Sequence, residues 1–199
     1  MIAGVMFGTA ALLVVGVTQY CKPEPKLFEI PIKKVNEPLL VKPNIRYVGP
    51  TYNFNNDLMV GVKFFEGFKS KKYKCCAGVP TIGYGCTDEN IVALGTISEK
   101  KASYILHHKI NDVRDNVRQA VTVDLTEYQL NALTSFAFNC GMTNLKTLIN
   151  GENRLNSGNY ESVENILPQY RKAGGKVREG LIKRRAWELS LWRGEPSIK

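Results

Sequence analysis

Hydrophobic and polar positions divide the 199-residue chain into three zones. Residues 1–21 contain no charged side chain and begin with the run MIAGVMFGTAALLVVGV. Residues 22–50 hold six of the nine prolines, which deny amide donors and favour extended backbone. Residues 51–199 alternate amphipathic stretches with short turns. The pattern therefore predicts a hydrophobic N-terminal helix (1–21), a proline-rich linker (22–50) and one folded domain (51–199).

The start of the domain is predicted to form a helix and a small sheet. Apolar positions favour a first helix from Asp57 to Glu66 that stops at Gly67. The glycine-rich, alternating residues 68–87 are typical of a hairpin. Ser98 then suits the N-cap of a long helix. The apolar positions of that helix follow a three- to four-residue period: Ala102, Leu106, Ile110, Val113 and Val117.

The second half of the domain is predicted to be mostly helical. Thr126 and Gln129 have capping-box spacing, and Gly141 suits the end of the helix that they begin. A short helix over 159–168 is expected to break near its proline, and a last helix is expected over 178–192. The fold class is therefore α+β, with a small N-terminal β-hairpin lobe and a mostly helical lobe.

The uncharged segment 1–21 has the length of a membrane span. Roughly 18 to 20 helical residues at about 1.5 Å each give about 27 to 30 Å, enough to cross a bilayer. Glycine, alanine and threonine reduce the apolar character of the segment, so the free energy gained when it inserts into a membrane is small. Residues 17–20 offer no small-x-small cleavage site, although a buried helix of a soluble protein stays an alternative.

The formal net charge of +9 indicates an anionic partner, which could be nucleic acid, anionic lipid or a wall polymer. Basic runs at 69–74, 171–172 and 183–185 suit such a polymer, and solvated surface is the plain alternative. No basic helix with regularly placed base-reading side chains stands out. We therefore expect no nucleic-acid partner.

Five cysteines are present, an odd number, so not all can pair within one chain. They are Cys21, Cys75, Cys76, Cys86 and Cys140. No CxxC pair or zinc-like Cys/His spacing occurs. The two histidines, His107 and His108, are adjacent and would point about 100° apart on a helix, which makes a poor metal site. We therefore expect no metal and no cofactor.

Chemistry is concentrated between residues 65 and 87. Glu66 sits at a predicted helix end among phenylalanines, where an apolar setting disfavours the carboxylate and would keep the acid protonated. A protonated acid can give its proton to a leaving oxygen. The hairpin after this helix could fold Cys75 and Thr81 back over Glu66. The candidate site thus holds an acid, a sulfur and a hydroxyl.

This stretch resembles the phage-type lysozymes, glycoside hydrolase family 24, which include many endolysins. The resemblance is carried by Glu66-Gly67, Tyr73-Lys74-Cys75, Gly78 and the run TIGYG at 81–85. Weaker similarity continues through 130–141 and 180–189, about three quarters of the chain in all. One departure is Cys86, which stands where the family often has histidine.

The resemblance implies a lysozyme-like fold and hydrolysis of the β-1,4 bond between N-acetylmuramic acid and N-acetylglucosamine. It makes Glu66 the general acid, places Cys75 where the family carries its second catalytic group, usually aspartate, and gives Thr81 a positioning role. A thiolate could act as base or nucleophile, so the stereochemical outcome stays open. Cys75 could instead be an inert thiol, and neighbouring Cys76 is a rival. An inactive wall-binding protein is the alternative function.

Some endolysins carry a weak N-terminal signal-anchor that is later released, and residues 1–21 are similar to one. This resemblance implies a monomer that acts on bacterial peptidoglycan, tethered first to the host inner membrane and then released into the periplasm. Lysines soon after the segment favour a cytoplasmic location for the domain, and this conflicts with a periplasmic site of action. We hypothesise that a disulfide restrains Cys75 while the chain is tethered, with Cys21, Cys76 or Cys86 as partner. A membrane that simply holds the site closed is the alternative.

Overall fold

The computed structural model describes residues 55–75 and 78–195. The predicted N-terminal helix (1–21) and linker (22–50) lie outside the described residues. Among the described helices, none combines the length and the apolar character that a membrane crossing requires.

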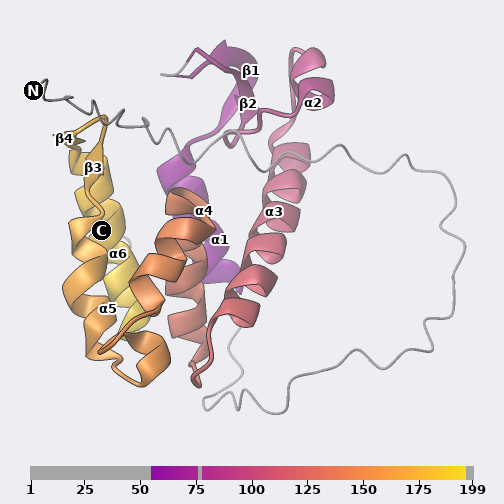
Figure 1. Ribbon diagram of the computed structural model, residues 1–199. Helices are drawn as coiled ribbons and strands as arrows, with labels where there is room; N and C mark the ends of the chain where they lie inside the picture. The colour runs from indigo at the N-terminus through magenta and orange to yellow at the C-terminus, as the bar shows by residue number, and fades with distance from the viewer. Residues whose placement is uncertain (1–54, 76–77, 196–199) are drawn as a thin grey trace, which may run out of the picture.

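Helix α1 (Asn55–Glu66) leads directly into an antiparallel hairpin of β1 (Lys69–Lys74) and β2 (Pro80–Gly83), as Figure 1 shows. In this hairpin Tyr73 lies opposite Thr81, and the register shifts between Lys69 and Tyr73. Such a shift bends a strand and increases its twist. The predicted helix and hairpin are both confirmed.

The second edge of β1 is also hydrogen-bonded. The backbone amide of Lys72 donates to the carbonyl of Gly95 at 3.0 Å, and the amide of Ile97 donates to the carbonyl of Ser70 at 2.8 Å. The hairpin is therefore tied on one side to the segment that leads into the long helix. An edge satisfied in this way is protected from pairing with other chains.

Two capped helices come after the hairpin. Helix α2 (Glu89–Ala93) begins after Asp88, whose carboxylate accepts hydrogen bonds from two backbone amides of its first turn. Helix α3 (Glu99–Ala120) begins after Ser98, whose hydroxyl accepts from the amide of Lys101 at 3.3 Å. The predicted Ser98 cap and the buried apolar stripe of α3 are confirmed. Helix α2 was not predicted, because its five residues are too few to show a helical period in the sequence.

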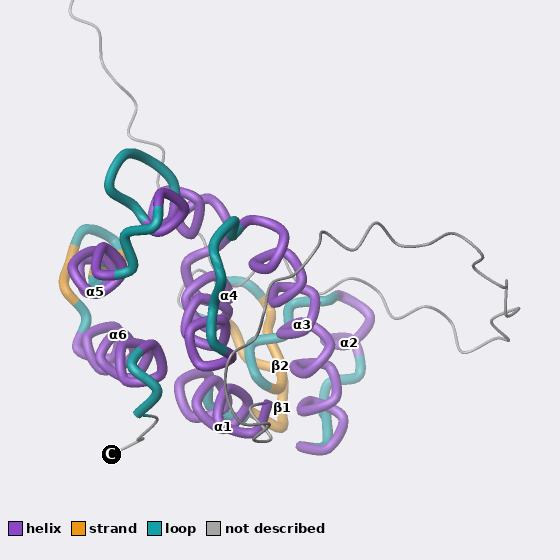
Figure 2. The backbone as a smooth tube through the Cα atoms, turned by 90° about the horizontal axis from the view of Figure 1, so that it is seen from below, coloured by secondary structure: helices purple, strands orange, loops and turns teal. Residues whose placement is uncertain are grey.

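Helix α4 (Glu127–Ile149) forms the centre of the helical lobe. It packs against α3, α1 and the last helix, and Figure 2 shows it lying between them. Its predicted capping box is present, with Thr126 and Gln129 bonded reciprocally. Gly141 interrupts the helical geometry with φ 83°, as its sequence position predicted, but a further helical stretch continues directly to Ile149.

The remaining elements complete the helical lobe on the side of α4 opposite α3 (Figure 1). The predicted break near Pro168 is a change from α-helix to 3-10 helix, and the predicted last helix is confirmed. The small strand pair before that helix was not predicted. These elements are η1 (Leu155–Ser157), α5 (Glu161–Ile166), η2 (Leu167–Gln169), β3 (Lys172–Ala173), β4 (Lys176–Val177) and α6 (Glu179–Trp192).

Helices α1 and α6 approach closely through a glycine. A Cβ atom on Gly61 would lie 1.9 Å from Cζ2 of Trp187, so only glycine fits there. The ring of Phe65, one turn further along α1, lies 5.4 Å from the ring of Trp187. This packing sets the spacing between the two helices that carry the charged residues of the site, Glu66 at the end of α1 and Arg184 within α6.

Candidate active site

Glu66 is the last residue of α1, and α6 holds its carboxylate. Nη1 of Arg184 donates to Oε1 of Glu66 at 2.7 Å. The Glu66 side chain is 18% exposed and that of Arg184 is 4% exposed, so the acid reaches solvent while its partner does not. The Arg184 guanidinium also lies over the ring of Phe65, at 5.6 Å from its centroid. The expected apolar setting of Glu66 is therefore incomplete, because a buried cation faces the acid.

Behind Arg184 lies a second carboxylate, that of Glu188, whose side chain has no solvent exposure. Its Oε1 accepts from the hydroxyl of Ser135 at 2.7 Å and from Nη2 of Arg185 at 2.9 Å, and it lies 3.3 Å from Nε of Arg184. Two buried arginines thus face two glutamates, of which Glu188 is fully buried and Glu66 is partly exposed. Buried charges are tolerated when they are paired and hydrogen-bonded in this way.

The basic run at 183–185 was expected to face an anionic polymer, and this expectation is wrong for two of its three residues. Arg184 and Arg185 are 3% and 1% exposed. They point inward because α6 carries them on the face that packs against α4, where Glu188 is also found. Lys183 alone is exposed, and it pairs with Glu179 on the same helix.

Cys75 and Thr81 meet around one backbone carbonyl. The amide of Cys75 donates to the carbonyl of Val79 at 3.0 Å, and Oγ1 of Thr81 donates to the same oxygen at 2.9 Å. The turn is closed by the amide of Gly78, which donates to the carbonyl of Cys75 at 2.8 Å. Cys75 is a half-buried thiol, and Thr81 is fully buried. The hairpin thus brings these two predicted residues together.

Rings and charges connect the end of α1 to the hairpin. The ring of Phe68 lies 5.4 Å from that of Tyr84, and Nζ of Lys63 lies 5.7 Å from the centroid of the Tyr84 ring. The Tyr84 hydroxyl donates to Oε1 of Glu99 on α3 at 2.8 Å. These contacts hold the hairpin in place against the end of α1, where Glu66 lies. The Glu66 carboxylate itself is hydrogen-bonded to Arg184 rather than to Cys75 or Thr81.

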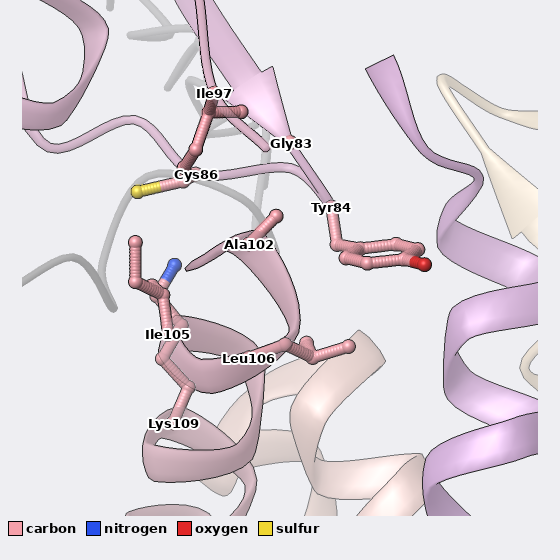
Figure 3. Close-up of a pocket in the computed structure, with 8 residues that line it drawn as sticks. All are labelled: Gly83, Tyr84, Cys86, Ile97, Ala102, Ile105, Leu106 and Lys109. Atoms are coloured by element: carbon pink, nitrogen blue, oxygen red, sulfur yellow. The ribbon is translucent and has the colours of Figure 1, made fainter. Parts of the chain in front are cut away.

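Lys109 is a buried residue of this lobe that sequence reasoning did not single out. It lines a cavity of about 10 Å³, room for about one water molecule, and Figure 3 shows its nitrogen pointing toward the segment that carries Cys86. Burial lowers the pKa of Lys109 to about 8, although the carboxylates of Glu66 and Asp88 raise it in part. The sequence did contain a signal, because Lys109 lies three residues after Leu106 on the apolar stripe of α3.

Two further cysteines lie in the described part of the chain. Cys86 is disulfide-bonded. Cys140 is a thiol whose sulfur accepts from Nη1 of Arg185 at 2.8 Å, and burial raises the pKa of that thiol. Cys21 and Cys76 lie outside the described residues. The hypothesis that a disulfide restrains Cys75 concerns a tethered form and stays a prediction.

Comparison with known proteins gives consistent matches. Residues 63–188, which include Glu66, Cys75, Thr81 and Arg184, match the family model described as Phage lysozyme. The endolysin of Bacillus phage B103 is 39% identical over 138 residues, covering 66% of this chain and 50% of that protein. A SAR-endolysin of Bacteriophage PS119 is 32% identical over 131 residues, covering 64% of this chain and 77% of that protein.

Among solved structures, a mutant of P22 lysozyme superimposes with a TM-score of 0.60 at 32% identity. The match covers 69% of this chain and 95% of that one. The chain spans about half the length of the first curated relatives that it matches. The fold and these similarities together place the chain in the phage lysozyme family.

Proposed function

We propose that the protein is an endolysin, a muramidase that hydrolyses the β-1,4 bonds between N-acetylmuramic acid and N-acetylglucosamine in bacterial peptidoglycan and so lyses the host cell. Membership of the phage lysozyme family and relatives named endolysin support this proposal. The observation that carries it is the partly exposed carboxyl of Glu66, held at 2.7 Å by the buried Arg184.

In this proposal Glu66 donates a proton to the glycosidic oxygen. As that proton leaves, negative charge develops on the carboxyl, and the fixed cation of Arg184 stabilises it. A preorganised charge in a water-poor setting is worth more than the same charge in water. Arg184 thus positions the acid and favours the state that forms during bond cleavage, while Glu188 and Ser135 hold Arg184 in place.

Cys75 and Thr81 are proposed to act on the other reactant, a water molecule. Thr81 is fully buried and its hydroxyl donates to the Val79 carbonyl, so it is proposed to position the water indirectly, by holding the turn that carries Cys75. The Cys75 thiolate then either takes a proton from that water or attacks the anomeric carbon itself. The anomeric configuration of the first product distinguishes the two routes.

We also propose that residues 1–21 are a signal-anchor that tethers the enzyme to the host inner membrane before its release into the periplasm. The uncharged run in the sequence and the relatives named SAR-endolysin support this proposal.

A turbidity assay on host cells with permeabilised outer membranes tests the proposed chemistry. Glu66→Gln is expected to abolish lysis, because an amide cannot donate the required proton. Glu161→Gln, an exposed change on α5, is the matched control and should lyse normally. Chromatography of digested peptidoglycan should show new muramic acid reducing ends with the unchanged protein. Lysis by Glu66→Gln, or wall binding without new reducing ends, would contradict a muramidase.

A further inference from the structure

A groove of about 550 Å³ lies between the hairpin and α2. Lys72, Tyr73 and Lys74 of β1 line it, together with Val79 just before β2, Pro80 at its start and residues of α2 that include Glu89 and Val92. Its volume falls in the range of about 300 to 1,000 Å³ that is usual for ligand sites. Neither Glu66 nor Arg184 lines it, so the groove is separate from the proton-donating part of the site.

The lysines of this groove differ from the buried arginines of the helical lobe. Arg114, Arg184 and Arg185 are buried, and each pairs with a carboxylate. Within the part of the chain that the structure describes, no ion pair involves a lysine of β1. Lys72 and Lys74 are exposed, so their charges are available to a ligand.

The opposite wall of the groove supplies different chemistry. Glu89, at the start of α2, is exposed and presents a carboxylate. Apolar groups in the lining come from Tyr73 of β1, from Val79 before β2 and from Val92 of α2. A ligand that complements these walls carries carboxylates for the lysines, an amine for Glu89 and small apolar groups between them. This is the chemistry of a short peptide that contains alanine, a D-isoglutamyl residue and a diamino acid.

The groove also adjoins the residues proposed to act on water. Lys74 directly precedes Cys75, and Tyr73 is the strand partner of Thr81. A chain bound in the groove therefore passes beside the turn around the Val79 carbonyl. The stem peptide of peptidoglycan is attached to the muramic acid residue, next to the bond that a muramidase cleaves.

We propose that the groove between the hairpin and α2 binds the stem peptide of peptidoglycan, with Lys72 and Lys74 on its carboxylates and Glu89 near its amine. The proposal rests on the proposed muramidase function and names a second part of the substrate that the same enzyme recognises.

The first test compares two substrates, intact peptidoglycan and the same glycan after an amidase has removed its peptides. The double variant Lys72→Ser with Lys74→Ser is expected to lose about fivefold in kcat/KM on intact peptidoglycan, since exposed charge pairs are individually weak. On the peptide-free glycan it should match the unchanged protein. The charge-retaining pair Lys72→Arg with Lys74→Arg should recover the lost activity.

The control removes the same charge from the same strand. Lys69 and Lys71 are exposed on β1 but do not line the groove, so Lys69→Ser with Lys71→Ser should leave the preference for peptide-bearing glycan unchanged. An equal loss in both double variants would overturn the proposal in favour of general attraction to an anionic wall. A loss by the groove variant on both substrates would also overturn it.

A binding measurement separates this proposal from the muramidase proposal. NMR titration of the full chain with a soluble stem tetrapeptide should give saturable shifts that Lys72→Ser with Lys74→Ser weakens, whether or not glycan is cleaved. Absence of peptide binding would overturn the proposal even if Glu66-dependent cleavage is established. Binding of phosphatidylglycerol vesicles through Lys72 and Lys74, without peptide binding, would overturn it in favour of a lipid surface.

Discussion

Two basic runs of this chain, 183–185 and 69–74, end in opposite surroundings. The helical run places Arg184 and Arg185 inside the protein against Glu66 and Glu188, and only Lys183 stays in solvent. The run in β1 leaves all four lysines exposed. Both runs are basic in the sequence, but the partner across the fold decides whether a charge is buried in an ion pair or stays in solvent.

Removing the buried carboxylate of Glu188 should lower the free energy of unfolding more than any other change to these charges. Glu188→Gln leaves two buried guanidinium groups without their shared anion, and breaking a buried pair costs about 3 to 5 kcal/mol. Urea unfolding of the two proteins measures the loss. Glu179→Gln removes the exposed partner of Lys183 and is expected to change nothing measurable. Similar results for both variants would mean that burial does not distinguish the charges.

The pH dependence of stability tests whether the charge of Lys109 is buried. Its pKa is lowered to about 8 by burial, below the ordinary value near 10.5. Between these values the unfolded chain binds more protons, so Lys109 contributes a rise in stability with pH, by roughly 3 kcal/mol in all. Lys109→Met lacks this contribution. Its stability relative to the unchanged protein should therefore fall as pH rises from 8 to 10.5 in urea titrations, and a constant difference would contradict the buried charge.

The spacing of α1 and α6 tests whether the acid and its cation depend on backbone packing. Gly61→Ala places a methyl against Trp187, and overpacking of this kind costs about 1 to 3 kcal/mol. Because the helices carry Glu66 and Arg184, lysis should fall more than the loss of folded protein explains. Gly180→Ala, at an open position of α6, is the control and should be stabilising by about 0.5 to 1 kcal/mol. Unfolding by circular dichroism alongside the lysis assay measures both.

The exposed run should show the smallest effect on folding. Replacing all four lysines of β1 by glutamine is expected to leave the free energy of unfolding within about 1 kcal/mol, because the lysines lack carboxylate partners in the described structure. Urea unfolding checks this. A larger loss would mean that the β1 lysines contribute to the fold as Arg184 and Arg185 do.

The parts of the fold that could be predicted are those that neighbours in sequence determine. The Ser98 cap, the Thr126 capping box and the hairpin over 68–87 depend on residues only a few positions apart. The same holds for the meeting of Cys75 with Thr81, because a short turn joins them. Such local patterns predict the backbone conformation without knowledge of distant contacts.

The residues that were missed depend on distant parts of the chain. Arg184 meets Glu66 across 118 positions, and nothing near either residue marks the other as its partner. Lys109 lies in an apolar stripe, but only the packing of α3 beneath the hairpin shows that its charge is enclosed. The run at 183–185 was misread for the same reason, since a helix can turn a charge inward wherever an acid lies to pair with it.

The carbonyl of Val79 accepts from both the amide of Cys75 and the hydroxyl of Thr81. This oxygen belongs to the main chain, so no side-chain replacement at position 79 deletes it. The backbone of Cys75 and the hydroxyl of Thr81 are consequently held by one main-chain oxygen, which any residue at position 79 supplies. The side chain at position 79 can therefore change without loss of the two hydrogen bonds that join Cys75 and Thr81.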